Sequence, residues 1–146
     1  IRGCIEALSS GYGIAEIAKG EINAGKESSM VSSVQGNLEK ITAEIVINAA
    51  KEKDKLALKI VDEAMTYLGI GVDSLIKLFN PELIVFSGGI AKSGKLFFGK
   101  LEKHISENKL REIDYIVKIV PSSFDEDATL IGAFSLVTSK ILQFNS

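Results

Sequence analysis

The stretch from Asp54 to Asn80 carries a continuous apolar stripe, and the apolar run "ELIVF" at 82–86 follows it almost directly. The stripe recurs at spacings of three and four, the period of a buried helix face, through Leu58, Val61, Ala64, Met65, Leu68, Val72, Leu75, Ile76 and Phe79. Pro81 disfavours helical geometry in the residue before it, so the helix is predicted to stop at Asn80. The run after it shows no alternation, which predicts a strand covered on both faces and a fold of the α/β class.

The chain before the long helix is predicted to be helical with one polar interruption. Residues 3–24 suit short helices that break around the Ser-Ser-Gly at 9–11. The polar run "GKESSMVSSVQGN" at 25–37 is predicted to be a surface loop. Thr42 is a predicted N-cap for a helix that ends near Lys53, and Asp54 is predicted to open the long helix that follows.

After the first strand, the pattern predicts a helix over 93–107, a second strand over 115–120 and a final helix over 127–142. The predicted inner face of that last helix consists of Leu130, Ile131, Ala133, Phe134, Val137 and Ile141. This order of elements is half of an α/β fold. Two strands do not make an adequate sheet, so further strands are expected from sequence outside this chain or from a partner.

Two glycines, Gly69 and Gly71, lie inside the long predicted helix. Each costs about 1 kcal/mol relative to alanine in a helix interior. We therefore expect another element to pack closely against that turn.

Composition excludes several classes of function. The chain is 46% hydrophobic and 25% charged, with a net charge of −2 and interspersed charges as in "AAKEKDKLALK", so this chain by itself is not expected to bind nucleic acid. No apolar run approaches the roughly 20 residues of a membrane-spanning helix. A single cysteine forms no internal disulfide, which fits a reducing compartment, and a cytoplasmic location is expected.

Ser87-Gly88-Gly89 lies directly between the predicted strand and the next helix. In α/β sheets, ligands bind beyond the carboxyl ends of strands, and glycine lets the backbone approach a phosphate or ribose. A plain strand-to-helix turn explains the same residues. Likewise, the carboxylates at 125–127 are explained by helix capping, and His104, on a predicted polar face, by solvation.

The start of the chain places Cys4 and Glu6 in an apolar setting. A lone cysteine of this kind is usually a small core residue. A carboxylate near an apolar face must be exposed or hydrogen-bonded. A sugar hydroxyl would satisfy it.

Three segments in this order, "GCIEALSSG", "LGIGVDSLIKLFNPELIVFSGGI" and "DATLIGAFSL", closely resemble the carboxy-terminal half of the ROK family of sugar kinases and sugar-responsive repressors. The resemblance implies that residues 1–146 form the carboxy-terminal lobe, incomplete at its amino-terminal end, of an actin-like (ribonuclease H-like) ATPase fold. The amino-terminal lobe would lie upstream, and dimers are common in the family.

The family carries a C-x-C-G-x-x-G-C-x-E segment whose cysteines, with a histidine, hold a structural zinc. Gly3-Cys4 matches its last Gly-Cys and Glu6 its glutamate. The resemblance therefore implies that Cys4 is one zinc ligand and that Glu6 hydrogen-bonds sugar hydroxyls. A tetrahedral zinc site needs more ligands than Cys4, so zinc is not expected to form in this chain by itself.

The same resemblance assigns Gly88 and Gly89 to the nucleotide and places Ser10-Gly11 near its adenosine side. The reaction implied for the parent protein is transfer of the ATP γ-phosphoryl group to a hexose hydroxyl, with Mg²⁺ on the phosphates. The catalytic aspartate and the phosphate loop find no match in this chain, so by itself it is expected to be inactive. Two alternatives stay open: a sugar-sensing transcriptional regulator, and an inactive dimerisation lobe.

Overall fold

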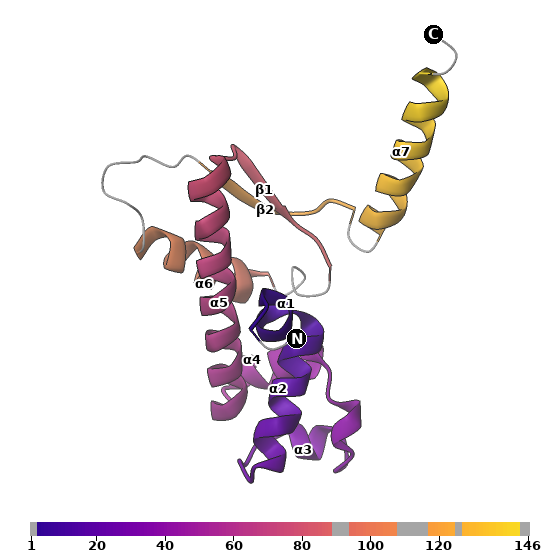
Figure 1. The fold of residues 1–146 in the computed structure, drawn as a ribbon. Coiled ribbons are helices and arrows are strands. Elements are labelled where there is room, and N and C mark those ends of the chain that lie inside the picture. Colours follow the sequence, from indigo (N-terminus) through magenta and orange to yellow (C-terminus); the bar gives the residue numbers. More distant parts are fainter. Residues whose placement is uncertain (1–2, 89–93, 108–116, 125–126, 144–146) are drawn as a thin grey trace.

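The computed structural model describes residues 3–88, 94–107, 117–124 and 127–143 (Figure 1). Its elements, in chain order, are the helices α1 (Ile5–Ser9), α2 (Gly11–Asn23), α3 (Met30–Ser33), the 3-10 helix η1 (Leu38–Lys40), α4 (Ala43–Lys51) and α5 (Lys55–Phe79), strand β1 (Leu83–Phe86), helix α6 (Lys95–Glu107), strand β2 (Lys118–Pro121) and helix α7 (Ala128–Gln143). The helix-rich α/β class predicted from the sequence is confirmed.

Helix α5 is the long axis on which α1, α2, α4 and α6 pack. The Asp54 side chain accepts a hydrogen bond from the Ala57 N–H and caps its start, and Asn80, with φ of 44°, closes its end before Pro81. Both boundaries agree with the prediction. Thr42 caps α4 in the same way by accepting from the Ile45 N–H.

The core lies between α5 and the helices that surround it. The largest fully buried side chains are Ile14, Met30, Ile76, Leu101 and Val46, which come from α2, α3, α5, α6 and α4. Helices before and after α5 in the sequence therefore share one core, which joins the start of the chain to the segment that follows β1. Among the described residues, no helix is long and apolar enough to cross a membrane.

Strands β1 and β2 pair in parallel, with Ile84 opposite Ile119. One face of β1 remains open, with Leu83 51% exposed and Val85 53% exposed, whereas Ile84 packs against the core. The prediction of a strand covered on both faces is therefore wrong for this chain. The helices of the chain cover one face of the two-stranded sheet, and a short β-branched run does not reveal whether its second cover belongs to the same chain.

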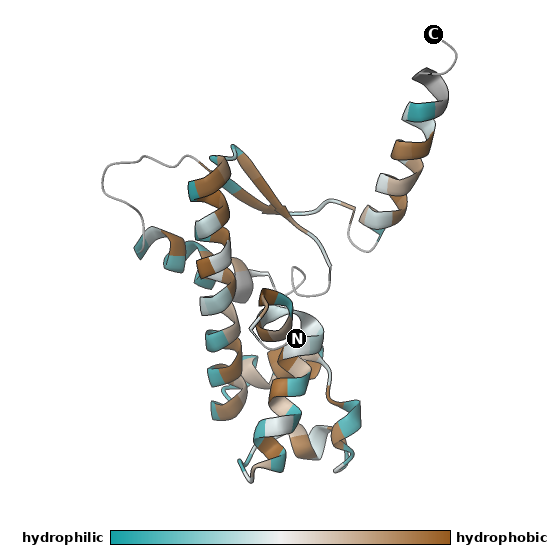
Figure 2. Ribbon diagram, in the orientation of Figure 1, coloured by the Kyte–Doolittle hydropathy of each residue, from teal (hydrophilic) through white to brown (hydrophobic). Residues whose placement is uncertain are grey.

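Helix α7 extends away from the body of the chain, and its hydrophobic residues are visible along its length (Figures 1 and 2). Leu130 is 71% exposed and Phe134 69% exposed. The helix forms as predicted, but its predicted inner face is not buried over residues 130–137; the side chain of Ile141 lies outside the described residues. Periodicity identifies an apolar stripe on a helix without identifying the element that would cover it.

The run at 25–37 is not a loop throughout, because it contains the short helix α3. Met30, at the start of α3, is 0% exposed. The carboxylate of Asp54 holds this segment by accepting hydrogen bonds from the Ser29 N–H at 2.7 Å, the Ser29 hydroxyl at 2.9 Å and the Ser28 hydroxyl at 3.0 Å. Sequence periodicity missed α3 because four residues are too few to show a helical period.

Replacing Asp54 with alanine is expected to lower the free energy of unfolding at neutral pH by about 1–3 kcal/mol, since a cap and several charge-assisted hydrogen bonds are lost together. Partial burial raises the pKa of Asp54, but hydrogen bonds from Ala57, Ser29 and Ser28 outweigh that effect and hold its pKa below the ordinary value. The stabilisation is therefore complete above the unfolded-state pKa, near 4, and is lost as the pH falls through the lower folded-state pKa.

Urea unfolding of the full-length protein at a series of pH values tests this prediction. The difference in unfolding free energy between wild type and Asp54→Ala should shrink as the pH falls below about 4. Glu52→Gln, which changes an exposed carboxylate two residues away, is the control and should follow the wild type. A difference that stays constant over the whole pH range would contradict the role of the ionised carboxylate.

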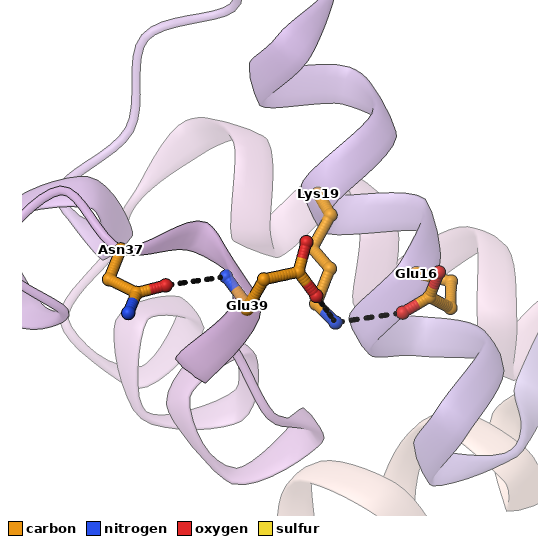
Figure 3. Close-up of polar contacts among 4 residues, drawn as sticks. All are labelled: Glu16, Lys19, Asn37 and Glu39. Atoms are coloured by element: carbon orange, nitrogen blue, oxygen red, sulfur yellow. Dashed lines mark hydrogen bonds and ion pairs between the residues drawn. The ribbon is translucent and has the colours of Figure 1, made fainter.

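One ion pair within α2 and one between α2 and η1 lie at the surface (Figure 3). The Lys19 ammonium lies 2.8 Å from a Glu16 carboxylate oxygen and 3.4 Å from one of Glu39. Asn37 caps η1 by accepting a hydrogen bond from the Glu39 N–H at 3.2 Å. Exposed pairs of this kind stabilise a fold by about 1 kcal/mol or less, so the buried core is what holds α2 in place.

Candidate functional site

Helices α1 and α2 meet in a tight corner that carries four of the residues singled out from the sequence. Cys4 precedes α1 and is half-buried, and Glu6 is exposed in the first turn. The Ser10 N–H donates to the Glu6 carbonyl at 3.1 Å, and the Ser10 side chain caps α2 by accepting from the Gly13 N–H at 3.0 Å. The predicted break at residues 9–11 is confirmed, and Cys4, Glu6, Ser10 and Gly11 lie within one local unit.

Glu6 lies on a short helix that is held by a hydrogen bond within α1 and by close contact with α2. The Ser9 hydroxyl, buried at 3% exposure, donates to the Ile5 carbonyl at 2.8 Å. A Cβ atom on Gly13 would lie 2.5 Å from the Ala7 carbonyl oxygen and 2.7 Å from that of Glu6. The two helices therefore approach this closely because residue 13 has no side chain. The sequence reasoning missed Gly13, although a second glycine in "GYG" was a visible signal.

Substituting Gly13 with alanine is expected to destabilise the protein, although alanine is the better helix former. The new methyl group meets backbone atoms of α1, which do not rotate aside, so the corner must open. Gly20→Ala is the matched control, because it lies on α2 with no heavy atom within 4 Å of the added Cβ. That variant should be stabilised by up to about 1 kcal/mol. In thermal unfolding, the midpoint temperature should be lower than that of the wild type for Gly13→Ala and higher for Gly20→Ala. Equal shifts in the two variants would contradict the close contact.

Gly88 lies on a separate element, at the carboxyl end of β1. Its φ is +90°, a conformation that favours glycine, and a Cβ there would meet no heavy atom within 4 Å. At the adjacent end of β2, the Ser122 N–H donates to the Phe86 carbonyl at 2.6 Å, and the Ser122 hydroxyl accepts from the Phe124 N–H at 3.1 Å. The open backbone at Gly88 therefore lies where parallel sheets bind ligands. Gly89 lies outside the described residues.

A metal site does not form from the described residues of this chain, among which no group of three or more His, Cys, Asp or Glu side chains gathers. Cys4 supplies one thiol to a site that takes four ligands. Tetrahedral zinc therefore does not fit the residues present here, and the assignment of Cys4 as a zinc ligand stays a prediction about a longer protein.

Three further expectations from the sequence concern His104, the two glycines of α5 and the carboxylates at 125–127. His104 is half-buried rather than solvated, because its ring packs against the helix turn at Gly69, and a Cβ on Gly69 would lie 2.4 Å from its Cδ2 atom. A Cβ on Gly71 would lie 2.3 Å from the Cδ1 atom of Ile5, so the expectation of close packing at the two helical glycines is confirmed. Of the carboxylates at 125–127, Asp127 is exposed and its N–H donates to the Phe124 carbonyl at 2.9 Å; residues 125 and 126 lie outside the described part.

A model of the ROK family matches residues 1–140 of the 146. The chain belongs to the ROK family. Among curated relatives, a glucokinase of Thermotoga maritima is 32% identical over 140 residues, which is 96% of this chain and 44% of that protein. A xylose repressor of Caldicellulosiruptor bescii is 30% identical over 142 residues, which is 97% of this chain and 35% of that protein. The chain thus spans less than half the length of these relatives.

Solved structures agree on the fold. A ROK family glucokinase from Streptomyces griseus, in complex with glucose and AMPPNP, superposes with a TM-score of 0.79 at 24% identity, over 93% of this chain and 45% of that one. A ROK family transcriptional regulator, a homologue of the Escherichia coli MLC protein, superposes with a TM-score of 0.70 at 32% identity, over 90% of this chain and 32% of that one. The ROK chain therefore has the fold of part of an actin-like lobe, as the sequence resemblance implied.

Proposed function

We propose that this ROK chain forms the carboxy-terminal lobe of an ATP-dependent hexose kinase. The exposed Glu6 carboxylate on the α1–α2 corner is the observation that carries the proposal. The carboxylate can accept hydrogen bonds from sugar hydroxyls, and the packing of α1 on α2 fixes the helix that carries it. The 32% identity to a glucokinase supports the same function. The sugar would bind at this corner.

The nucleotide would bind along the backbone at Gly88, with Gly89 beside it and Ser10-Gly11 on the adenosine side. Support for this comes from the positive φ and the open surroundings of Gly88 at the end of a parallel strand. ATP and Mg²⁺ are proposed for the full-length protein, where the ion would neutralise charge on the phosphates. Cys4 is proposed to join a structural zinc there with ligands from outside this chain.

In the proposed reaction, a sugar hydroxyl attacks the γ-phosphorus of ATP, and ADP leaves. Glu6 accepts a hydrogen bond from another hydroxyl and orients the sugar, which brings the attacking oxygen into line. The proton of that oxygen would go to a carboxylate base, which is proposed to lie in the other lobe. In this proposal the lobe described here binds and orients the ligands.

A sugar-sensing transcriptional regulator is the second candidate, favoured by the similarity to the xylose repressor and to the solved regulator. The α1–α2 corner would serve both functions, since a hexose must bind in each. A third possibility, an assembly lobe that binds neither ligand, would leave the Glu6 corner without a role. A homodimer is compatible with all three.

The deciding experiment measures ADP formation by the full-length protein with ATP, Mg²⁺ and a panel of hexoses. A kinase forms ADP only when its sugar is present. A regulator binds a hexose in calorimetry, forms no ADP and changes its retention of DNA when the sugar is added. A dimer in sedimentation that binds neither glucose nor AMPPNP would overturn both ligand-binding functions.

A further inference from the structure

The two glycines of α5 contact different elements in different ways. A Cβ on Gly71 would meet the Cδ1 atom of Ile5, the far end of a flexible side chain, at 2.3 Å. A Cβ on Gly69 would meet the His104 ring at 2.4 and 2.6 Å and the His104 Cβ atom at 3.1 Å. Ile5 can rotate its terminal methyl away. The Cβ of His104 is fixed to the backbone of α6, so of the two glycines Gly69 is the one whose missing side chain determines how closely α6 approaches α5.

Helix α6 crosses α5 and packs against it (Figure 1). Leu101 is completely buried, and Lys100 forms an ion pair with Asp62 of α5. Phe98, one helical turn before Leu101, contacts Phe86 edge to face, with ring centroids 6.2 Å apart and an interplanar angle of 81°. A displacement of α6 from α5 is therefore transmitted to the end of β1.

Phe86 is the last residue of β1, two positions before Gly88. We propose that Gly69 is a positioning residue for the nucleotide: the absence of its side chain lets His104 seat α6 on α5, and α6 fixes the strand end at Gly88 through the Phe98–Phe86 contact. The proposal rests on the proposed function, because it takes Gly88 as part of the nucleotide site. The α1–α2 corner with Glu6 packs on α5 through Ile5 at Gly71, a contact separate from that of His104 with Gly69.

The test compares Gly69→Ala with Gly71→Ala in the full-length protein. Both variants gain the same helix propensity, so any difference arises from their neighbours. Gly69→Ala is expected to raise the KM for ATP about tenfold, because a shift of the order of 1 Å in a positioning element changes ligand geometry, with a change below about threefold in the KM for glucose. Gly71→Ala should change both KM values less than about threefold.

The double variant Gly69→Ala/His104→Ala provides the rescue. Removal of the ring eliminates the contacts at 2.4 and 2.6 Å and leaves only the Cβ atom at 3.1 Å, so the KM for ATP should return to within about threefold of that of His104→Ala alone. A general loss of folding would move both KM values and would not be rescued. If the wild-type protein binds ATP, either of two results would overturn the positioning role and leave the proposed function standing. One is an equal effect of Gly69→Ala on the KM values for ATP and glucose, and the other is the absence of rescue in the double variant. Failure of the wild-type protein to bind AMPPNP would overturn the proposed function and this inference with it.

Discussion

Glu6→Gln in the full-length protein is expected to weaken glucose binding by about 10- to 100-fold, because a hydrogen bond to a charged acceptor contributes roughly 1.5–3 kcal/mol. Glutamine keeps the size of the side chain but carries no charge and offers one acceptor oxygen in place of two. Binding of AMPPNP should change by less than about twofold, since the nucleotide is assigned to Gly88 on another element. Calorimetry with each ligand measures both effects.

Glu44→Gln is the matched control for this prediction. Glu44 is also an exposed glutamate in the first turn of a helix, α4, so its substitution removes the same favourable charge from a helix N-terminus. It should leave the affinities for glucose and AMPPNP unchanged. If Glu6→Gln weakened both ligands equally, Glu6 would not be the sugar acceptor, and its effect would lie in the corner itself.

Leu101→Ala is expected to lower the free energy of unfolding by about 2–5 kcal/mol. The side chain is 0% exposed where α6 meets α5, and its truncation leaves a cavity that a helix fixed at Lys100 and His104 cannot close. Chemical denaturation of the full-length protein measures the loss. The expected effect exceeds that of the Asp54 variant because the transfer and cavity contributions add.

Leu78→Ala tests the same chemistry on the surface. Leu78 is 75% exposed on α5, and its truncation should change the unfolding free energy by less than about 0.5 kcal/mol. Comparable losses in the two variants would show that Leu78 is covered in the full-length protein or that α6 does not pack as described. The unfolding free energy of the wild-type protein in the same denaturant is the reference for both variants.

Much of the local structure could be predicted from the sequence because its signals act over a few residues. The caps of Thr42 and Asp54, the stop before Pro81 and the change from helical to strand pattern all matched. Helix α3 could not be predicted, because what stabilises it is the burial of Met30 and the contacts with Asp54, which is 25 residues from Ser29.

For the candidate site, the residue types were visible in the sequence and their arrangement was not. Glu6 and Gly88 were identified by resemblance to the ROK family. The sequence pattern predicted a solvated His104 and indicated no role for Gly13. Both roles come from close approaches between helices, and these depend on which elements pack together.

The sequence by itself determined the class of fold, the helix and strand order and the family, because these depend on periodicity, capping and motif order along the chain. Only the tertiary structure decided which apolar faces are covered and what the glycines are for. It left Leu83, Val85 and the stripe of α7 exposed, and it placed His104 on Gly69 and the Glu6 carbonyl against Gly13. The physical reason is that burial and close approach belong to pairs of surfaces, and a linear pattern describes only one surface of each pair.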